Sequence, residues 1–166
     1  GDASLLGEIM AGQHPEPEDL DEPADKFGQT ALHRATAGGH TACVGLLLNG
    51  GAAVSVKNAF GHSPLHLAAR CGHAAILREL LRRGAPLTTT DQHGYAAIHV
   101  AAQHNQKEIL HLLLLAGADR DATTAFGTSA AEIASSEYHV DLAELLGASF
   151  QQTKGVVADA EAQARR

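Results

Sequence analysis

The chain of 166 residues contains no tryptophan, and only 4% of its residues are aromatic, although 45% are hydrophobic. Alanine and leucine must therefore fill most of the core, which favours helices that pack closely together. Two cysteines are too few for a disulfide framework, and the sequence lacks an Asn-x-Ser/Thr glycosylation motif. We therefore expect an intracellular protein, cytoplasmic or nuclear.

Long hydrophobic segments and an excess of positive charge are also missing. The longest apolar run, within residues 109–116, is interrupted by His111 and is far shorter than the roughly 20 residues that a membrane span needs. The 19 acidic residues outnumber the 12 lysines and arginines, giving a net charge of -7, whereas nucleic-acid binders need basic surface against phosphates. We expect neither membrane insertion nor binding to nucleic acid.

The sequence lacks the common motifs of catalysis. It has no G-x-x-x-x-G-K-S/T phosphate loop, no H-E-x-x-H zinc motif and no G-x-S-x-G nucleophile turn. We therefore expect no catalytic residues, no cofactor and no metal. The chain begins with Gly1-Asp2 rather than methionine, which we interpret as a cloning scar or an excised segment.

What the sequence does contain is an internal repeat with a period of about 33 residues. Glycines and alanines recur at that interval, and rows of leucines follow in the same register. The two series are Gly28, Gly61, Gly94 and Gly127, and Ala35, Ala68, Ala101 and Ala134. Matches at so many independent positions indicate a stack of similar structural units.

The repeated residues resemble the ankyrin repeat, whose T-P-L-H-x-A motif is matched most closely by residues 63–68, Ser-Pro-Leu-His-Leu-Ala. The resemblance covers about residues 25–148 and implies an all-α solenoid of helix-turn-helix units with short β-hairpin-like tips. We predict an N-terminal capping helix and acidic loop (1–24), repeats at 25–57, 58–90 and 91–123, a divergent capping repeat (124–150) and a tail (151–166).

Local signals agree with these units. In each unit a glycine suits a turn with positive φ, and Thr30 or Ser63 can cap the helix that follows. The second helix of each unit is predicted to end at a glycine such as Gly84. In the fourth unit Glu132 replaces the motif histidine and Tyr138 replaces a turn glycine, as suits a terminal repeat with solvent on one side.

The segment that ends at Asp25 contains eight acidic side chains and no lysine or arginine. Leu5, Leu6, Ile9 and Met10 have helical spacing and are predicted to form the capping helix. Residues 14–23 contain three prolines, and we expect a solvated, poorly ordered loop, with a docking site for a basic partner as the alternative.

Eleven histidines raise the question of a metal site. The resemblance implies structural roles for six: His33, His66 and His99, which would bond backbone and tie adjacent turns together, and His40, His73 and His139 at the start of the second helices. Cys71 and His104 occupy equivalent places in neighbouring repeats, so a metal- or ligand-responsive sensor is an alternative function. The paired spacing of dedicated zinc ligands is absent.

In the ankyrin family, partners are usually held by the tips and by the inner face of the first helices. Three of the four phenylalanines recur beside a tip glycine, where they either pack on neighbouring turns or contact a partner. We predict ten partner-binding residues: Phe27, Phe60, His62, Arg70, Cys71, His93, Tyr95, Gln103, His104 and Phe126.

The sequence thus predicts a monomeric protein-protein interaction module, acting as an adaptor, scaffold or regulatory subunit. Its partner is expected to be another protein or a peptide, bound by the tips and the concave groove without catalysis. Besides the sensor, a second alternative is that the chain is the interaction segment of a larger enzyme or channel.

Overall fold

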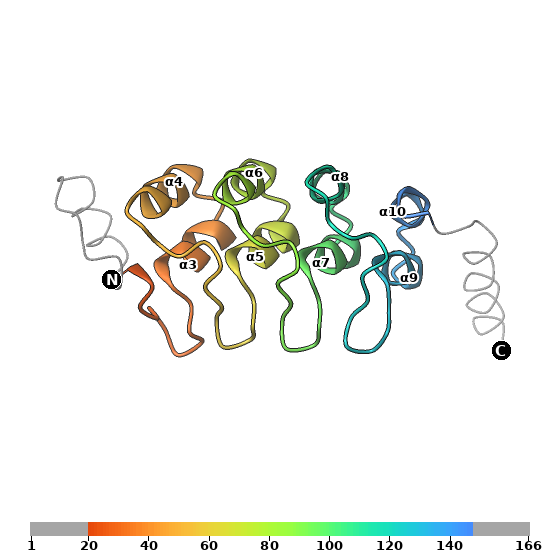
Figure 1. Cartoon of the computed structure of the whole chain (residues 1–166), viewed down its shortest axis with the longest axis horizontal. Helices are drawn as coiled ribbons and strands as arrows, with labels where there is room; N and C mark the ends of the chain where they lie inside the picture. Colours follow the sequence, from red (N-terminus) through yellow and green to blue (C-terminus); the bar gives the residue numbers. More distant parts are fainter. Residues whose placement is uncertain (1–19, 148–166) are drawn as a thin grey trace.

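The computed structural model describes residues 20–147, which form eight helices in four consecutive pairs. The pairs are α3 (Ala31–Ala37) with α4 (Thr41–Asn49), α5 (Pro64–Cys71) with α6 (Ala74–Arg82), α7 (Ala97–Gln103) with α8 (Lys107–Leu115), and α9 (Ala130–Ser136) with α10 (Val140–Leu145). They stack side by side in two rows, and the tips project beyond the row of first helices (Figure 1). The predicted all-α solenoid is confirmed.

The first helix of each pair begins where the motif residues cap it. Thr30, before α3, accepts a hydrogen bond from the backbone N–H of His33. Ala96, before α7, has no hydroxyl, and its own backbone N–H donates to Nδ1 of His99 at 3.1 Å. The imidazole of His99 therefore fixes the residue before the helix in the third repeat, where no Ser or Thr hydroxyl is present.

The core lies between the two rows of helices and is aliphatic, as the composition predicts. Large side chains such as Leu77 and Leu110 are fully buried on the second helices. Neighbouring first helices pack directly on one another, and the alanines between them, including Ala68, Ala101 and Ala134, have no exposed surface. Small side chains let these helices approach closely and hold the tips at a fixed spacing.

The turn between the helices of a pair requires a left-handed residue. Gly39 and Gly72 occupy it in the first two repeats, with φ of 74° and 76°, and Asn105 follows in the third with φ of 54°. In the fourth pair Tyr138 adopts φ of 60°, a conformation that is costly for a bulky side chain.

The expectation of a solvated acidic loop is wrong for Leu20 and Asp21, whereas Glu22 and Pro23 are exposed as expected. Leu20 is only 1% exposed and lies against Gly50, where an added Cβ would come within 3.1 Å of the leucine side chain. The carboxylate of Asp21 accepts from the backbone N–H of Ala53 at 2.9 and 3.1 Å. The predicted capping helix over Leu5 to Met10 and the tail at 151–166 lie outside the described residues.

Candidate binding groove

The motif histidines join each repeat to the tip that follows. Nδ1 of His66 accepts from the backbone N–H of Ser63 at 3.2 Å, and its Nε2–H donates to the carbonyl of Tyr95 at 2.8 Å. His33 repeats the arrangement with a carbonyl of the second tip, and His99 with one that leads into the fourth tip, both at 2.9 Å. Burial lowers the pKa of all three imidazoles. They are therefore neutral, with the proton on Nε2, and their role is structural.

A second set of side chains reaches backward from the start of the second helices. His73 contacts the carbonyl of Ala37 at 3.3 Å, and His139 contacts that of Gln103 at 3.2 Å. The third repeat has Gln106 at this place, and its Nε2 donates to the carbonyl of Arg70 in α5 at 3.3 Å. Each bond secures the end of the preceding first helix, and two of these helices, α5 and α7, carry residues of the groove described below.

The tips are closed by one side chain in every repeat, a feature that the sequence reasoning missed. Oδ1 of Asp91 accepts from the backbone N–H groups of His93 and Tyr95 at 2.8 and 2.9 Å. Equivalent bonds are made at the matching positions of the other repeats, by Asp25, Asn58 and Thr124. The regular spacing of these four oxygen-bearing side chains could have revealed them.

Backbone bonds also join each tip to the next. The N–H of Ala59 donates to the carbonyl of Phe27 at 2.9 Å, and that of Ala125 donates to the carbonyl of His93 at 3.1 Å. The tips therefore form a continuous row with fixed spacing. Side chains on this row are held in place before any partner arrives.

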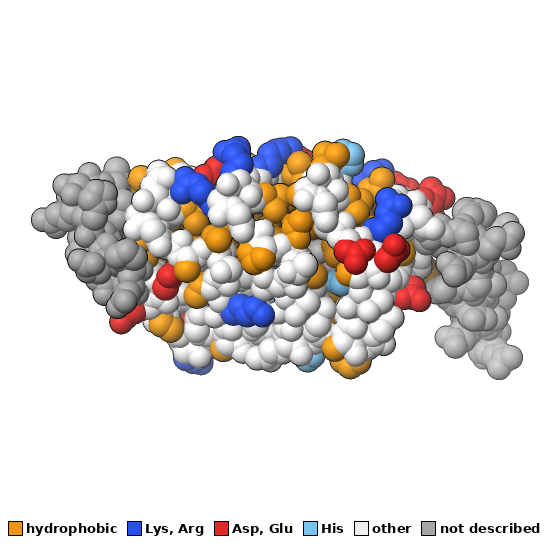
Figure 2. Space-filling model, viewed as in Figure 1, with side chains coloured by type: hydrophobic (Ala, Val, Ile, Leu, Met, Phe, Trp, Pro, Cys, Tyr) orange, Lys and Arg blue, Asp and Glu red, His pale blue; other side chains and the backbone are white. Residues whose placement is uncertain are grey.

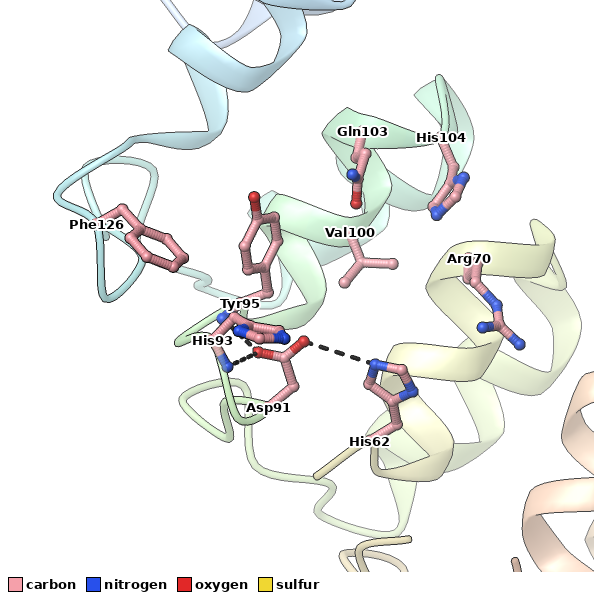
Figure 3. Close-up of a pocket in the computed structure, with 9 residues that line it drawn as sticks. All are labelled: His62, Arg70, Asp91, His93, Tyr95, Val100, Gln103, His104 and Phe126. Atoms are coloured by element: carbon pink, nitrogen blue, oxygen red, sulfur yellow. Dashed lines mark hydrogen bonds and ion pairs between the residues drawn. The ribbon is translucent and has the colours of Figure 1, made fainter. Parts of the chain in front are cut away.

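A groove of about 450 Å³ lies between the tips of the second to fourth repeats and the first helices of the second and third, α5 and α7 (Figure 3). Seven of the ten predicted partner-binding residues line it, together with Asp91 and Val100, which the sequence reasoning did not single out. The seven are His62, Arg70, His93, Tyr95, Gln103, His104 and Phe126. Phe27, Phe60 and Cys71 do not line it.

Asp91 lies at the base of the groove and is well partnered. Its side chain is only 8% exposed, and Oδ2 lies 3.5 Å from Nε2 of His62. Burial lowers the pKa of His62 more than the charge of Asp91 raises it. Burial also lowers the pKa of His104, and the positive charge of Arg70 lowers it further. Both imidazoles are therefore neutral near pH 7.

The aromatic residues differ in how far they are used for packing. The rings of Phe27 and Phe60 stack with centroids 6.0 Å apart, yet 42% and 47% of their surface stays exposed. Among residues 20–147, Phe126 stacks on His93 alone, at 6.4 Å, and it is 74% exposed. Tyr95 is half-buried and contacts the motif histidine of its repeat edge-on at 6.0 Å. Phe126 thus leaves most of its ring free beside the groove.

The sequence matches two protein-family models over most of its length. A model described as ankyrin repeats in three copies matches residues 1–91, and a model of one ankyrin repeat matches residues 93–125. The chain belongs to the ankyrin repeat family. A search of curated proteins found no match. Both family matches are to ankyrin repeats, and no enzyme domain was identified.

The matched ranges of this ankyrin-repeat chain end before α9 and α10. The first helix of that pair, α9, nevertheless packs on α7 in the same way as the earlier first helices pack on one another. Glu132 shows why the sequence diverges here: its carboxylate accepts from the N–H and the hydroxyl of Ser129 at 2.8 and 2.9 Å. It caps the helix as the motif histidine does, and within residues 20–147 its carboxylate bonds to Ser129 and to no other repeat. The repeat boundaries stay a prediction.

The sensor alternative gains no support from the ankyrin-repeat structure. Cys43 and Cys71 are free, half-buried thiols. Within residues 20–147, no three or more histidine, cysteine, aspartate or glutamate side chains are grouped so that they could hold a metal ion. In the same part of the chain, every helix is too short or too polar to cross a membrane.

Arginines of the second repeat gather on the opposite side of the ankyrin stack. Figure 2 shows lysine and arginine side chains along the edge formed by the second helices. Arg78 pairs with Glu108 at 2.9 Å, and Arg83 pairs with Glu79 at 3.1 Å. These charges are matched by carboxylates on the protein, as expected for a solvated outer face.

Proposed function

We propose that this ankyrin-repeat protein binds a segment of another protein in the groove of its second to fourth repeats. Ankyrin repeats generally serve as protein-binding modules. The observation that supports this groove most is Phe126, an aromatic ring that is 74% exposed at its edge. Exposed aromatic side chains on a rigid scaffold are typical anchors of interfaces.

The contrast between the two faces supports the groove as the binding surface. On the outer face, Arg78 and Arg82 of α6 and Arg83 directly after it already have carboxylate partners. In the groove, Tyr95, Phe126 and Arg70 lie on elements that hydrogen bonds between repeats hold in place. A surface that is ordered before binding loses little conformational entropy on association.

We infer that the chain acts as an adaptor, scaffold or regulatory subunit and has no catalysis of its own. The free thiols of Cys43 and Cys71 support an intracellular setting, where thiols stay reduced. The partner is proposed to be a protein or peptide, held by a monomer through the groove. The ten predicted residues remain our proposed contact set, with the seven in the groove at its centre.

Selection of peptides tests this proposal. A phage library of random dodecapeptides is panned against the wild-type protein, and the enriched peptides are synthesised for affinity measurements. Phe126→Ala should weaken their binding about tenfold or more, as expected for an interface anchor. Because the ring is mostly exposed, the variant should fold normally, which circular dichroism would verify.

Leu115→Ala is the matched control, because Leu115 is 72% exposed and does not line the groove. It should leave affinity unchanged. Failure to enrich any peptide, or equal losses in the two variants, would contradict binding in the groove.

A further inference from the structure

Arg70 is unusual among the arginines of its repeat. Its side chain is exposed and lines the groove. Arg78, Arg82 and Arg83 each pair with a glutamate, whereas the guanidinium of Arg70 has no ion pair or hydrogen bond within the described part of the chain. An unpaired guanidinium facing a binding groove offers several N–H donors to a ligand.

The negative charge of the groove, on Asp91, is already partnered, unlike the positive charge of Arg70. Asp91 is the acidic residue among those that line it, and its carboxylate is almost buried and bonded to two backbone N–H groups. The charge of Glu137, which does not line the groove, offsets only part of the lowering of the pKa of His104. The groove therefore presents an accessible positive charge, and its own aspartate is occupied.

We propose that the groove binds an extended peptide segment carrying one aspartate or glutamate, whose carboxylate bonds to Arg70. An aromatic or aliphatic side chain of the same segment lies against Tyr95 and Phe126. This specificity rests on the function proposed above and defines the class of partner. The protein as a whole is acidic, with a net charge of -7, so attraction of an acidic segment depends on this local arrangement.

The geometry favours a carboxylate over a phosphate. A phosphorylated side chain carries about two negative charges, and sites that read it usually gather several basic groups. Here Arg70 is the permanent positive charge, because His62 and His104 have lowered pKa values and are neutral near pH 7. Asp91 would also repel a second negative charge. A single carboxylate matches one arginine, and the two imidazoles remain as neutral hydrogen-bond partners.

The fold also limits the spacing of the two recognised side chains. Arg70 lies at one end of the groove and Phe126 at the other, with Tyr95 and Val100 between them (Figure 3). They belong to repeats two units apart, and packed helices are about 8–10 Å apart. An extended chain advances about 3.3 Å per residue. Because the long arginine side chain spans part of the distance, the acidic residue should be about three to six positions from the apolar one.

The test uses the peptides enriched against wild-type protein. Aspartate or glutamate should recur at a fixed distance from an apolar residue. For one such peptide, affinities are measured by fluorescence anisotropy in a cycle that combines Glu→Gln in the peptide with Arg70→Gln in the protein. The peptide substitution should weaken binding to wild type about tenfold, as expected for a charge-assisted hydrogen bond, and should change binding to Arg70→Gln less than about twofold.

Arg120→Gln is the matched control, because Arg120 is also exposed, does not line the groove and makes no side-chain ion pair or hydrogen bond within residues 20–147. In this variant the peptide substitution should weaken binding as much as it does in wild type. That result would show that the effect of Arg70→Gln comes from a local contact and not from the loss of one positive charge. Two results would overturn this inference and leave the proposed function standing. One is that enriched peptides lack an acidic residue, and the other is that Glu→Gln in the peptide weakens binding to Arg70→Gln protein as much as to wild type. Tighter binding of a phosphoserine peptide would overturn the carboxylate assignment. If no peptide is enriched, the proposed function fails as well.

Discussion

Tyr138 carries the least favourable backbone conformation of the fourth repeat. Its φ is 60°, in the left-handed region, where a side chain with a Cβ costs roughly 1–2 kcal/mol. The equivalent positions hold Gly39, Gly72 and Asn105, residues that tolerate this region well. The ring is 58% exposed, so packing offsets little of the backbone cost.

Tyr138→Gly should therefore raise the free energy of unfolding, by about 1 kcal/mol. Urea denaturation followed by circular dichroism measures it. Asn105→Gly is the comparison, and its gain should be smaller because asparagine already accepts this conformation. A less stable Tyr138→Gly protein would show that the exposed ring contributes more than the backbone cost.

At the level of the structural element, the hairpin tip depends on how closely its glycine approaches the next tip. A Cβ built on Gly94 would overlap the backbone N of Ala125. Gly84, which follows the second helix of the preceding repeat, has the same φ of 79° but nothing within 4 Å of such a Cβ. The two glycines thus share a backbone requirement and differ in their neighbours.

Both Gly94→Ala and Gly84→Ala should be destabilising because of the positive φ. Gly94→Ala should cost about 1–3 kcal/mol more, since the methyl group forces two tips apart. The difference between the two urea-unfolding free energies measures that contact. Equal losses would mean that the tips can separate without cost.

Across the whole molecule, buried histidines make stability depend on pH. Burial holds the pKa values of His33, His66 and His99 below the ordinary value of 6.5. The unfolded chain therefore binds more protons than the folded chain between the lowered pKa values and 6.5. Their contribution is fully present above that range and is lost as the pH falls through the lowered pKa values.

The urea concentration at the unfolding midpoint should accordingly decrease when the pH is lowered from about 7.5 to about 5. His62 and His104, whose pKa values are also lowered by burial, act in the same direction. Glu132, whose pKa is lowered by its bonds to Ser129, adds a loss only below its ordinary value near 4.5. A midpoint that rises on acidification would refute the assignment of neutral imidazoles.

Sequence reasoning predicted the repeated parts of the fold well, because each helix start and turn glycine is specified several times over. It did not separate the phenylalanines: Phe60 stacks on a neighbouring tip, whereas Phe126 stays exposed because the described residues provide no fifth tip. Residue type and position are the same in both cases, so only the neighbours distinguish them. Leu20 was missed because the acidic, proline-rich residues around it are typical of a solvated loop.

The bonds that join the repeats connect each unit only to its immediate neighbours. A deletion of one whole repeat would let the flanking units meet through the same set of bonds. Loss of a single residue within a tip would misalign every donor and acceptor there. Insertions and deletions of complete repeats should therefore be tolerated better than changes of a single residue in a tip, both in evolution and in engineering.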